Sequence, residues 1–306
     1  MQATNSGLST IGILYPGEMG AALARLFRAG GFRVVTTCRD RSRRTAESAR
    51  RAGLELLDGL ESVVAISDII LSLVPPAAAL DVAREVASYA TALPPLYVDA
   101  NSISPETAQE IERVLGECGI RFVDAAIHGL ASRLPQQGRM YLSGSEAATL
   151  AQQWQGVLPT RVVGNEPGRA SAMKMLLSGV SKGLVALFLE IALTARETGQ
   201  LDAFLENCDE FYPAIMSAVG RMLPTYPRHA WRRAQELEEL EGMLRHFGLR
   251  PGMTAEARGL IAAVANADLA GPAEAGELSV RDLIEFVGLN NPLRFAEALS
   301  AADAAN

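Results

Sequence analysis

The sequence predicts an α/β fold, in which a doubly wound parallel sheet is followed by an all-helical second half. Short β-rich runs alternate with helical patterns over the first 165 residues, which is typical of a parallel sheet with right-handed crossovers. After Gly168 the strand-like runs stop, and the pattern is helical to the end of the chain. The 306 residues are ample for two domains, which we expect over 1–167 and 168–306.

The strands and helices of the first half are predicted from residue composition and from the glycines, prolines and charged residues that end each segment. Short apolar or β-branched runs bounded by glycine, proline or charge predict strands. Apolar residues three to four positions apart predict helices, and Gly30 with Gly31 ends the first of them. In chain order we expect strands over 9–15, 32–37, 69–74, 96–99 and 122–125, with helices over 19–29 and 43–51 among them.

One long apolar helix opens the second half. Residues 170–199 contain no proline, and their apolar positions spread broadly around a helix of ~1.5 Å rise per residue. We expect this helix over 168–199, joining the two domains and buried between domains or between subunits. The helices that follow are punctuated by prolines.

Composition excludes several classes of protein. The net charge is −7, from 35 acids and 28 bases, which disfavours nucleic-acid binding. The longest apolar stretch, 180–195, is interrupted by Lys182 and Glu190, so we expect no membrane span. The first ten residues lack the pattern of a signal peptide, and three dispersed cysteines indicate reduced thiols in the cytoplasm. Three histidines without ligand spacing predict no metal site.

The first expected strand–helix turn has the features of a dinucleotide site. In the G-x-G-x-x-G fingerprint, Gly17 and Gly20 occupy the second and third glycine positions, while Tyr15 stands where the first glycine belongs. Glu18 and Met19 follow Gly17, and the N–H groups at this helix start favour the phosphates of a cofactor. An ordinary strand–helix turn is the alternative, and the effect of Tyr15 on pyrophosphate binding stays open.

The residues after the second expected strand indicate whether the site prefers NAD or NADP. An NAD site has an acidic residue there, but this chain places four arginines within residues 39–44. Guanidinium groups suit the 2′-phosphate of NADP, and we choose Arg39 with Ser42 or Arg43 for that role. Asp40 keeps NAD(H) possible, so NADP(H) is favoured but not exclusive.

Four segments, in order and at matching intervals, resemble the β-hydroxyacid dehydrogenase superfamily, the relatives of 3-hydroxyisobutyrate and 6-phosphogluconate dehydrogenases. The resemblance covers residues 11 to about 200 and implies a Rossmann domain and a homodimer joined through C-terminal helices. The last hundred residues look more like a divergent, phosphogluconate-dehydrogenase-like branch of unassigned substrate. The matching segments are Ile11–Gly20, Val98–Pro105, Phe122–Gly129 and Gly168–Ser178.

Lys174 is the expected general acid and base. It stands in an apolar helical context that would lower the pKa of its amine, and the resemblance implies the same role. Snorkelling of the amine to solvent is the alternative. Ser178, one turn later on the same face, replaces an asparagine of the family and is expected to bind substrate or orient the amine.

Further site residues are expected at the carboxyl ends of later strands. Asn101 and Ser102 follow the strand 96–99, with Asn101 expected at the cofactor and Ser102 near nicotinamide and substrate; the alternative for Ser102 is a helix cap, for which Ser104 is better placed. Val74 and Pro75 are expected beside the adenosine half of the cofactor, or else simply end a strand.

The substrate loop departs from the family. His128 replaces its serine and Leu130 a second glycine; His128 either bonds a substrate oxygen or is structural, and Gly129 permits close backbone approach. His229 is expected to be structural. The acidic run 236–241 is expected to be a solvated face, unless Glu236 points inward toward an amine-bearing or hydroxyl-rich substrate.

Together these features predict an NADP-dependent oxidoreductase that acts on a small hydroxy acid or its aldehyde or keto partner. An imine reductase on the same scaffold is a second hypothesis, although the retained Lys174 argues against it. A non-catalytic NADPH-binding sensor is a third, kept open by the substitutions at His128 and Ser178.

Overall fold

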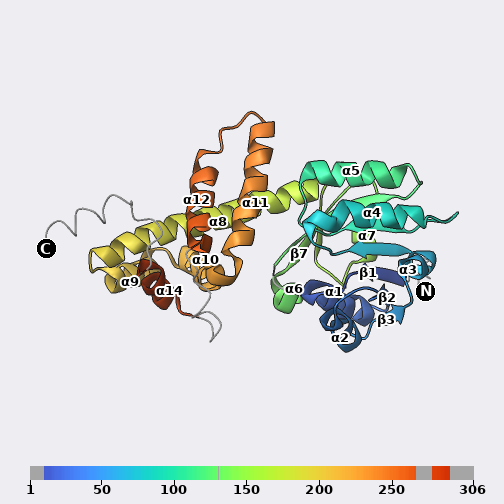
Figure 1. Ribbon diagram of the computed structural model, residues 1–306, viewed down its shortest axis with the longest axis horizontal. Helices are drawn as coiled ribbons and strands as arrows, with labels where there is room; N and C mark the ends of the chain where they lie inside the picture. Colours follow the sequence, from blue (N-terminus) through green and yellow to red (C-terminus); the bar gives the residue numbers. More distant parts are fainter. Residues whose placement is uncertain (1–9, 130, 267–277, 290–306) are drawn as a thin grey trace. The chain divides into compact units, whose positions relative to one another are not determined.

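The computed structural model describes residues 10–129, 131–266 and 278–289 (Figure 1). The chain divides into two compact units, residues 1–174 and 175–306. The predicted boundary at 167/168 precedes the long helix α8 (Arg169–Glu197), whereas this division falls within its second turn. Each unit is described separately below.

The first unit is built on an eight-stranded sheet in the order β3-β2-β1-β4-β5-β6-β7-β8. All neighbours are parallel except β6 and β7, which are antiparallel. The strand order reverses between β1 and β4, and in such sheets ligands bind at the carboxyl ends of the strands beside this switch point. The strands are β1 (Thr10–Leu14), β2 (Arg33–Thr37), β3 (Glu55–Leu57), β4 (Ile69–Ser72), β5 (Leu96–Asp99), β6 (Phe122–His128), β7 (Arg139–Ser143) and β8 (Thr160–Gly164).

Helices cover both faces of this sheet (Figure 1). One core contains residues of α1, α2, α6 and α7, and the opposite core contains residues of α3, α4 and α5. Strand side chains alternate between the two cores, as the pleat requires: Ile69 and Leu71 face the first, and Ile70 faces the second. The helices are α1 (Glu18–Ala29), α2 (Arg43–Arg51), α3 (Leu60–Ile66), α4 (Ala79–Ser88), α5 (Pro105–Gly116), α6 (Leu134–Gln137) and α7 (Ala147–Gln153), with 3-10 turns η1 (Pro76–Ala78) and η2 (Ala131–Arg133).

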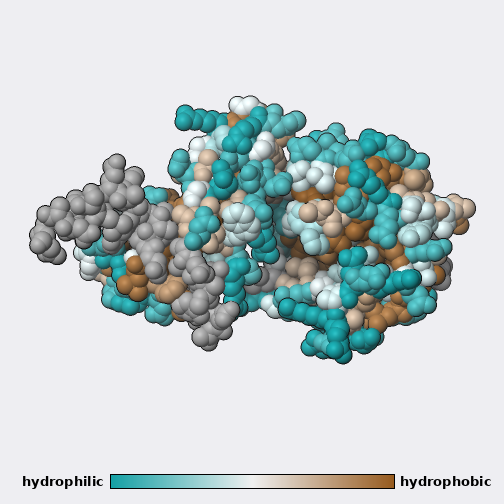
Figure 2. All heavy atoms as spheres, viewed as in Figure 1, coloured by the Kyte–Doolittle hydropathy of each residue, from teal (hydrophilic) through white to brown (hydrophobic). Residues whose placement is uncertain are grey.

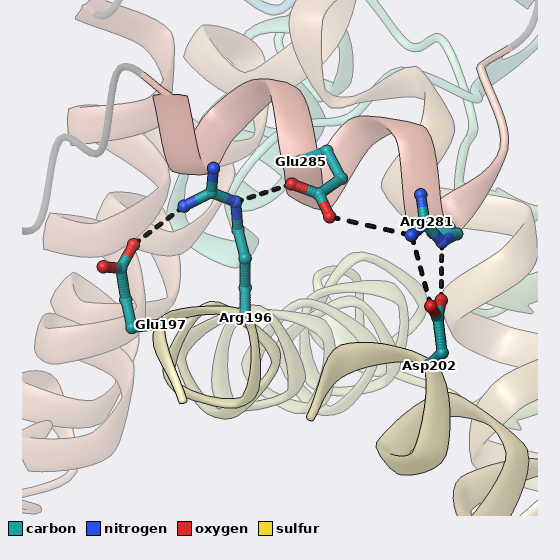
Figure 3. A network of polar contacts seen from close by, with 5 residues as sticks. All are labelled: Arg196, Glu197, Asp202, Arg281 and Glu285. Atoms are coloured by element: carbon teal, nitrogen blue, oxygen red, sulfur yellow. Dashed lines mark hydrogen bonds and ion pairs between the residues drawn. The ribbon is translucent and has the colours of Figure 1, made fainter. Parts of the chain in front are cut away.

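The second unit is helical throughout its described residues. Arginine–carboxylate pairs connect its helices, as the network in Figure 3 shows: Arg196 near the end of α8 pairs with Glu285 of α14, and Arg281 of α14 pairs with Asp202 of α9. The helices after α8 are α9 (Leu201–Phe211), α10 (Pro213–Met222), the 3-10 turn η3 (Leu223–Thr225), α11 (Tyr226–His246), α12 (Gly252–Asn266) and α14 (Val280–Leu289).

The α/β class, the helical second half and the long connecting helix are confirmed. The predicted strands did not include β3, β7 or β8, and within the predominantly parallel sheet the β6–β7 pair is antiparallel. The acidic run also needs a correction, because Glu241 is only 2% exposed and pairs with Arg245 and Arg258.

Helix α8 is long and apolar enough to cross a membrane, judged by length and composition alone. The sequence analysis did not expect this, because Lys182 and Glu190 interrupt its longest apolar stretch. Core helices of soluble proteins meet the same criterion, and α8 places Lys182 among its buried residues.

Candidate functional site

The turn between β1 and α1 leaves room for a ligand beside Gly17. A Cβ atom built on Gly17 would meet no protein atom within 4 Å, and no side chain caps the start of α1. A Cβ on Gly20 would instead lie 3.4 Å from the Cγ2 of Ile13, so this glycine allows close packing of helix on strand. Open space in front of uncapped N–H groups fits a pyrophosphate, and Glu18 and Met19 form the first turn there.

Tyr15 stacks with an arginine from the neighbouring strand end. The guanidinium carbon of Arg41 lies 3.7 Å from the centroid of the Tyr15 ring. Because β1 and β2 are parallel neighbours, the residues that follow them meet at one edge of the sheet. Arg41 was not among the arginines selected from the sequence, although its position after β2 and an aromatic residue after β1 together would have indicated it.

The three residues that the sequence predicted for the 2′-phosphate, Arg39, Ser42 and Arg43, lie within two residues of Arg41 in sequence. Arg39 is exposed, lies two residues after the end of β2, and donates its backbone N–H to the Thr37 Oγ1 at 3.3 Å. Ser42 caps α2 by accepting a hydrogen bond from the Thr45 N–H at 3.2 Å, and the exposed Arg43 begins that helix. Figure 2 shows a hydrophilic surface over α2. This basic edge suits a phosphate group.

Asn101 joins the carboxyl ends of β4 and β5. Its Oδ1 accepts the Val74 N–H at 2.6 Å, and its Nδ2 donates to Ser72 Oγ at 3.1 Å and to Asp99 Oδ2 at 2.8 Å. The Asn101 side chain is buried and these bonds use its polar atoms, so the residue fixes the loop that presents Ser102. Pro75, beside Val74, directly precedes the 3-10 turn η1. Ser104 caps α5, as expected.

Asp99 is a fully buried carboxyl at the end of β5. Burial raises its pKa to about 7, hydrogen bonds from Asn101 oppose the rise, and the nearby Asp124 adds to it. The positive charge of Lys174 acts in the opposite direction and lowers the pKa of Asp99. Sequence reasoning did not single out Asp99 as an ionisable group.

A second buried carboxyl, Asp124 on β6, holds the start of α8. Its Oδ2 accepts the backbone N–H groups of Gly168 and Ala170 at 2.9 Å and of Ser171 at 3.1 Å. The hydroxyls of Ser143 and Ser171 also donate to Asp124, at 2.9 and 2.7 Å. This carboxylate satisfies the N–H groups that a helix start leaves free, and it fixes α8 to the sheet.

Lys174 lies on the second turn of α8 and reaches the loop after β5. Its Nζ donates to the Ser102 Oγ at 2.6 Å, and Ser102 is exposed. The structure thus brings together two of the predicted catalytic residues within the first unit. The Ser102 hydroxyl, as the acceptor in this bond, keeps its own proton to donate to another group.

The remaining predicted residues are placed separately. His128 is exposed at the end of β6, opposite Arg139 of β7, and Gly129 follows it with a positive φ of 129°. Leu130 lies outside the described residues. Ser178 belongs to the second unit, where it accepts a hydrogen bond from Lys182, and Glu236 pairs with the same lysine. His229, near the start of α11, is partly buried, and burial lowers its pKa.

Comparisons with known proteins agree with this architecture. Residues 10–157 match the family model for the NAD binding domain of 6-phosphogluconate dehydrogenase, and residues 195–264 match a domain of unknown function, DUF1932. An uncharacterized 28.5 kDa protein of Methanothermus fervidus is 32% identical over 249 residues, which cover 79% of this chain and 94% of the relative. Among solved structures, the conserved protein MTH1747, whose structure is described as similar to 3-hydroxyacid dehydrogenases, is 32% identical with a TM-score of 0.69, covering 86% of this chain and 99% of that one.

More distant structures share the fold. A 3-hydroxyisobutyrate dehydrogenase of Mycobacterium tuberculosis is 18% identical with a TM-score of 0.68, over 92% of this chain and 99% of its own. An imine reductase of Myxococcus stipitatus in complex with NADP+ is 22% identical with a TM-score of 0.57, over 91% and 99%.

The fold and the matched family models define an oxidoreductase scaffold that binds a nicotinamide cofactor. The chain belongs to the β-hydroxyacid dehydrogenase superfamily, in a divergent branch marked by its DUF1932 region.

Proposed function

We propose that the chain is an NADP-dependent dehydrogenase that transfers a hydride between nicotinamide and a small hydroxy acid, or its aldehyde or keto partner. The observation that supports this most is the 2.6 Å contact between Lys174 Nζ and Ser102 Oγ, at the edge of the sheet where ligands bind in doubly wound folds. Bound nicotinamide would supply the hydride chemistry. The chain's own residues must handle the proton and hold the substrate oxygen.

Lys174 and Ser102 divide these tasks. In the oxidation direction, a neutral Lys174 Nζ accepts the proton of the substrate hydroxyl; in reduction, its ammonium returns a proton to the carbonyl oxygen. The Ser102 hydroxyl accepts from Lys174 with one of its lone pairs, and its own proton is left to donate a hydrogen bond to substrate. Ser178, His128 and Gly129 are proposed to contact the remainder of the substrate.

We propose that the residues following β1 and β2 bind the cofactor. The open space at Gly17 and the close-packed Gly20 suit the pyrophosphate at the start of α1. Arg39 and Arg41, with Ser42 or Arg43, suit a 2′-phosphate and thus NADP(H) over NAD(H). We propose a cytoplasmic homodimer joined through the C-terminal helices. In support, α8 exposes apolar side chains at Leu176, Val180, Leu187 and Ile191.

The decisive experiment is a screen of small hydroxy acids, aldehydes and cyclic imines with NADPH and NADH, followed by nicotinamide absorbance. We expect turnover of a hydroxy acid or its carbonyl partner, with NADPH preferred, and loss of turnover in Lys174→Met. Turnover of imines alone would favour the imine reductase, whose scaffold the chain shares. NADPH binding without any turnover, unaltered in Lys174→Ala, would favour a sensor.

A further inference from the structure

Lysine is almost absent from this chain. Of its 28 basic residues, 26 are arginine, and the two lysines are Lys174 and Lys182. Both lie on α8, eight residues apart, with Ser178 midway between them, and residues spaced by four share one face of a helix. A lysine differs from an arginine in its compact charge and in a proton that it can exchange. One of the two lysines belongs to the proposed site already; the other has no assigned role.

Lys182 is held between two side chains within the helical unit. Its side chain is only 5% exposed, and its Nζ lies 2.7 Å from Glu236 Oε2 on α11. The same ammonium donates a hydrogen bond to the Ser178 Oγ one turn earlier on α8. Glu236 also meets Arg232 at 3.5 Å. The carboxylate of Glu236 is therefore matched by cations of the chain itself, which weighs against the idea that it awaits an amine-bearing substrate.

The charge of Lys182 depends on this pairing. Burial lowers the pKa of its amine, and Glu236 raises it through charge and a hydrogen bond. Arg233 and Arg232, one turn before Glu236 on α11, lower the pKa of Lys182. Without Glu236, burial and the two arginines would all favour the neutral amine.

We propose that Lys182 is a positioning residue, which engages the lone pair of Ser178 so that the Ser178 hydroxyl donates its own proton to an electron-rich oxygen of the substrate. This inference rests on the proposed function, because it names the group that Ser178 serves. The arrangement repeats that of Lys174 and Ser102: in both cases an ammonium donates to a serine and leaves that serine a donor. Such a donor favours a carboxylate or a developing alkoxide over a cationic iminium nitrogen.

The kinetic test is a double-mutant cycle on the hydroxy acid that the wild-type protein turns over best. We expect Lys182→Met to lower kcat/KM about tenfold, Ser178→Ala to lower it by a similar factor, and the double variant to be no worse than either, because Lys182 acts through Ser178. Lys182→Arg should restore part of the loss. If kcat/KM in the double variant fell by the product of the two single-variant factors, the two residues would act independently and the proposal would be overturned.

Glu241→Gln is the matched control. It removes a buried charge of α11 whose ion pairs are with Arg245 and Arg258 rather than with Lys182. We expect it to lower the melting temperature without changing kcat/KM. An effect on kcat/KM as large as that of Lys182→Met would mean that any damage to α11 gives this loss, and would overturn the proposal.

A second readout needs no substrate. Because the chain contains two lysines, protein labelled with ¹⁵N-lysine gives two side-chain amine signals, and Lys182→Met assigns them. We expect Ser178→Ala to shift the Lys182 signal and Glu236→Gln to lower its titration midpoint further. A Lys182 signal that is unchanged in both variants would overturn the proposal, whereas absence of turnover with both shifts present would count against the proposed function alone.

Discussion

Lys174 and Ser102 are separated by 72 positions in sequence, yet the amine of one lies 2.6 Å from the hydroxyl of the other. Two buried carboxyl groups account for this meeting. Asp124 fixes the start of α8, which bears Lys174, and Asp99 accepts two hydrogen bonds from Asn101, which precedes Ser102. The proposed catalytic pair thus depends on side chains that do not themselves touch substrate.

Replacing Lys174 by methionine tests its role as acid and base. Because general acid–base catalysis contributes about 10²–10⁴-fold, we expect kcat to fall by that order, while NADPH binding is unchanged. Lys174→Arg separates charge from proton transfer, since a guanidinium keeps its proton at neutral pH. Steady-state kinetics and cofactor fluorescence measure both effects. An arginine variant with near-normal kcat would show that only the positive charge is needed.

Replacing Asp124 by alanine tests the attachment of α8 to the sheet. The change leaves buried N–H groups of Gly168, Ala170 and Ser171 without their acceptor. Hydrogen bonds to a charged group contribute about 1.5–3 kcal/mol each, so we expect a loss of ~3 kcal/mol or more in the free energy of unfolding, measured with urea. Asp81→Ala, at an exposed pair with Arg84, should cost about 0.5 kcal/mol or less. Equal losses in the two variants would contradict the assignment.

Arg41 and Tyr15 give the test of cofactor choice. If Arg41 binds the 2′-phosphate, Arg41→Ala should raise the Kd for NADPH about tenfold, the equivalent of ~1.4 kcal/mol, and leave the Kd for NADH unchanged. Tyr15→Leu removes the stack that holds the guanidinium and should act in the same direction by about threefold. Arg51→Ala, exposed at the end of α2, is the control. Equal weakening of both cofactors would place Arg41 at a phosphate common to the two.

The sequence predicted the elements whose local pattern is strong. The range 43–51 for α2 and the cap at Ser104 followed from charge, spacing and a Ser-Pro start. It did not predict β7 or β8, since a strand at the far side of the sheet is defined by its partners rather than by its own few residues.

In the candidate site, too, residues within a local motif were predicted and residues brought together by the fold were not. Lys174 and Ser102 were identified because motifs surround them. The stack of Arg41 on Tyr15, the pairing of Lys182 with Glu236 and the cap at Asp124 join residues that are distant in sequence, so no local pattern reports them. Asp99 was passed over for a different reason: its unusual titration arises from burial, and burial depends on the complete fold.

Asp99 provides a pH-dependent test of that burial. Its pKa is about 7 in the folded protein against an ordinary value of 3.8, so the folded state holds this proton more tightly than the unfolded chain. The stability contributed by protonated Asp99 is complete below the unfolded pKa and disappears as the pH rises through the folded pKa. Stability from this group should therefore decline between about pH 4 and pH 7, by at most ~1.4 kcal/mol per pH unit.

Asp99→Asn removes the titration and isolates this contribution from those of the other carboxyl groups. We expect the difference in unfolding free energy, wild type minus variant, to become smaller as the pH is raised across that window, in urea titrations at several pH values. Asp81→Asn, which changes an exposed carboxyl, should show no such trend. A difference that stays constant with pH would mean that Asp99 ionises normally in the folded protein, and that Asn101 and Lys174 stabilise its carboxylate as strongly as burial disfavours it.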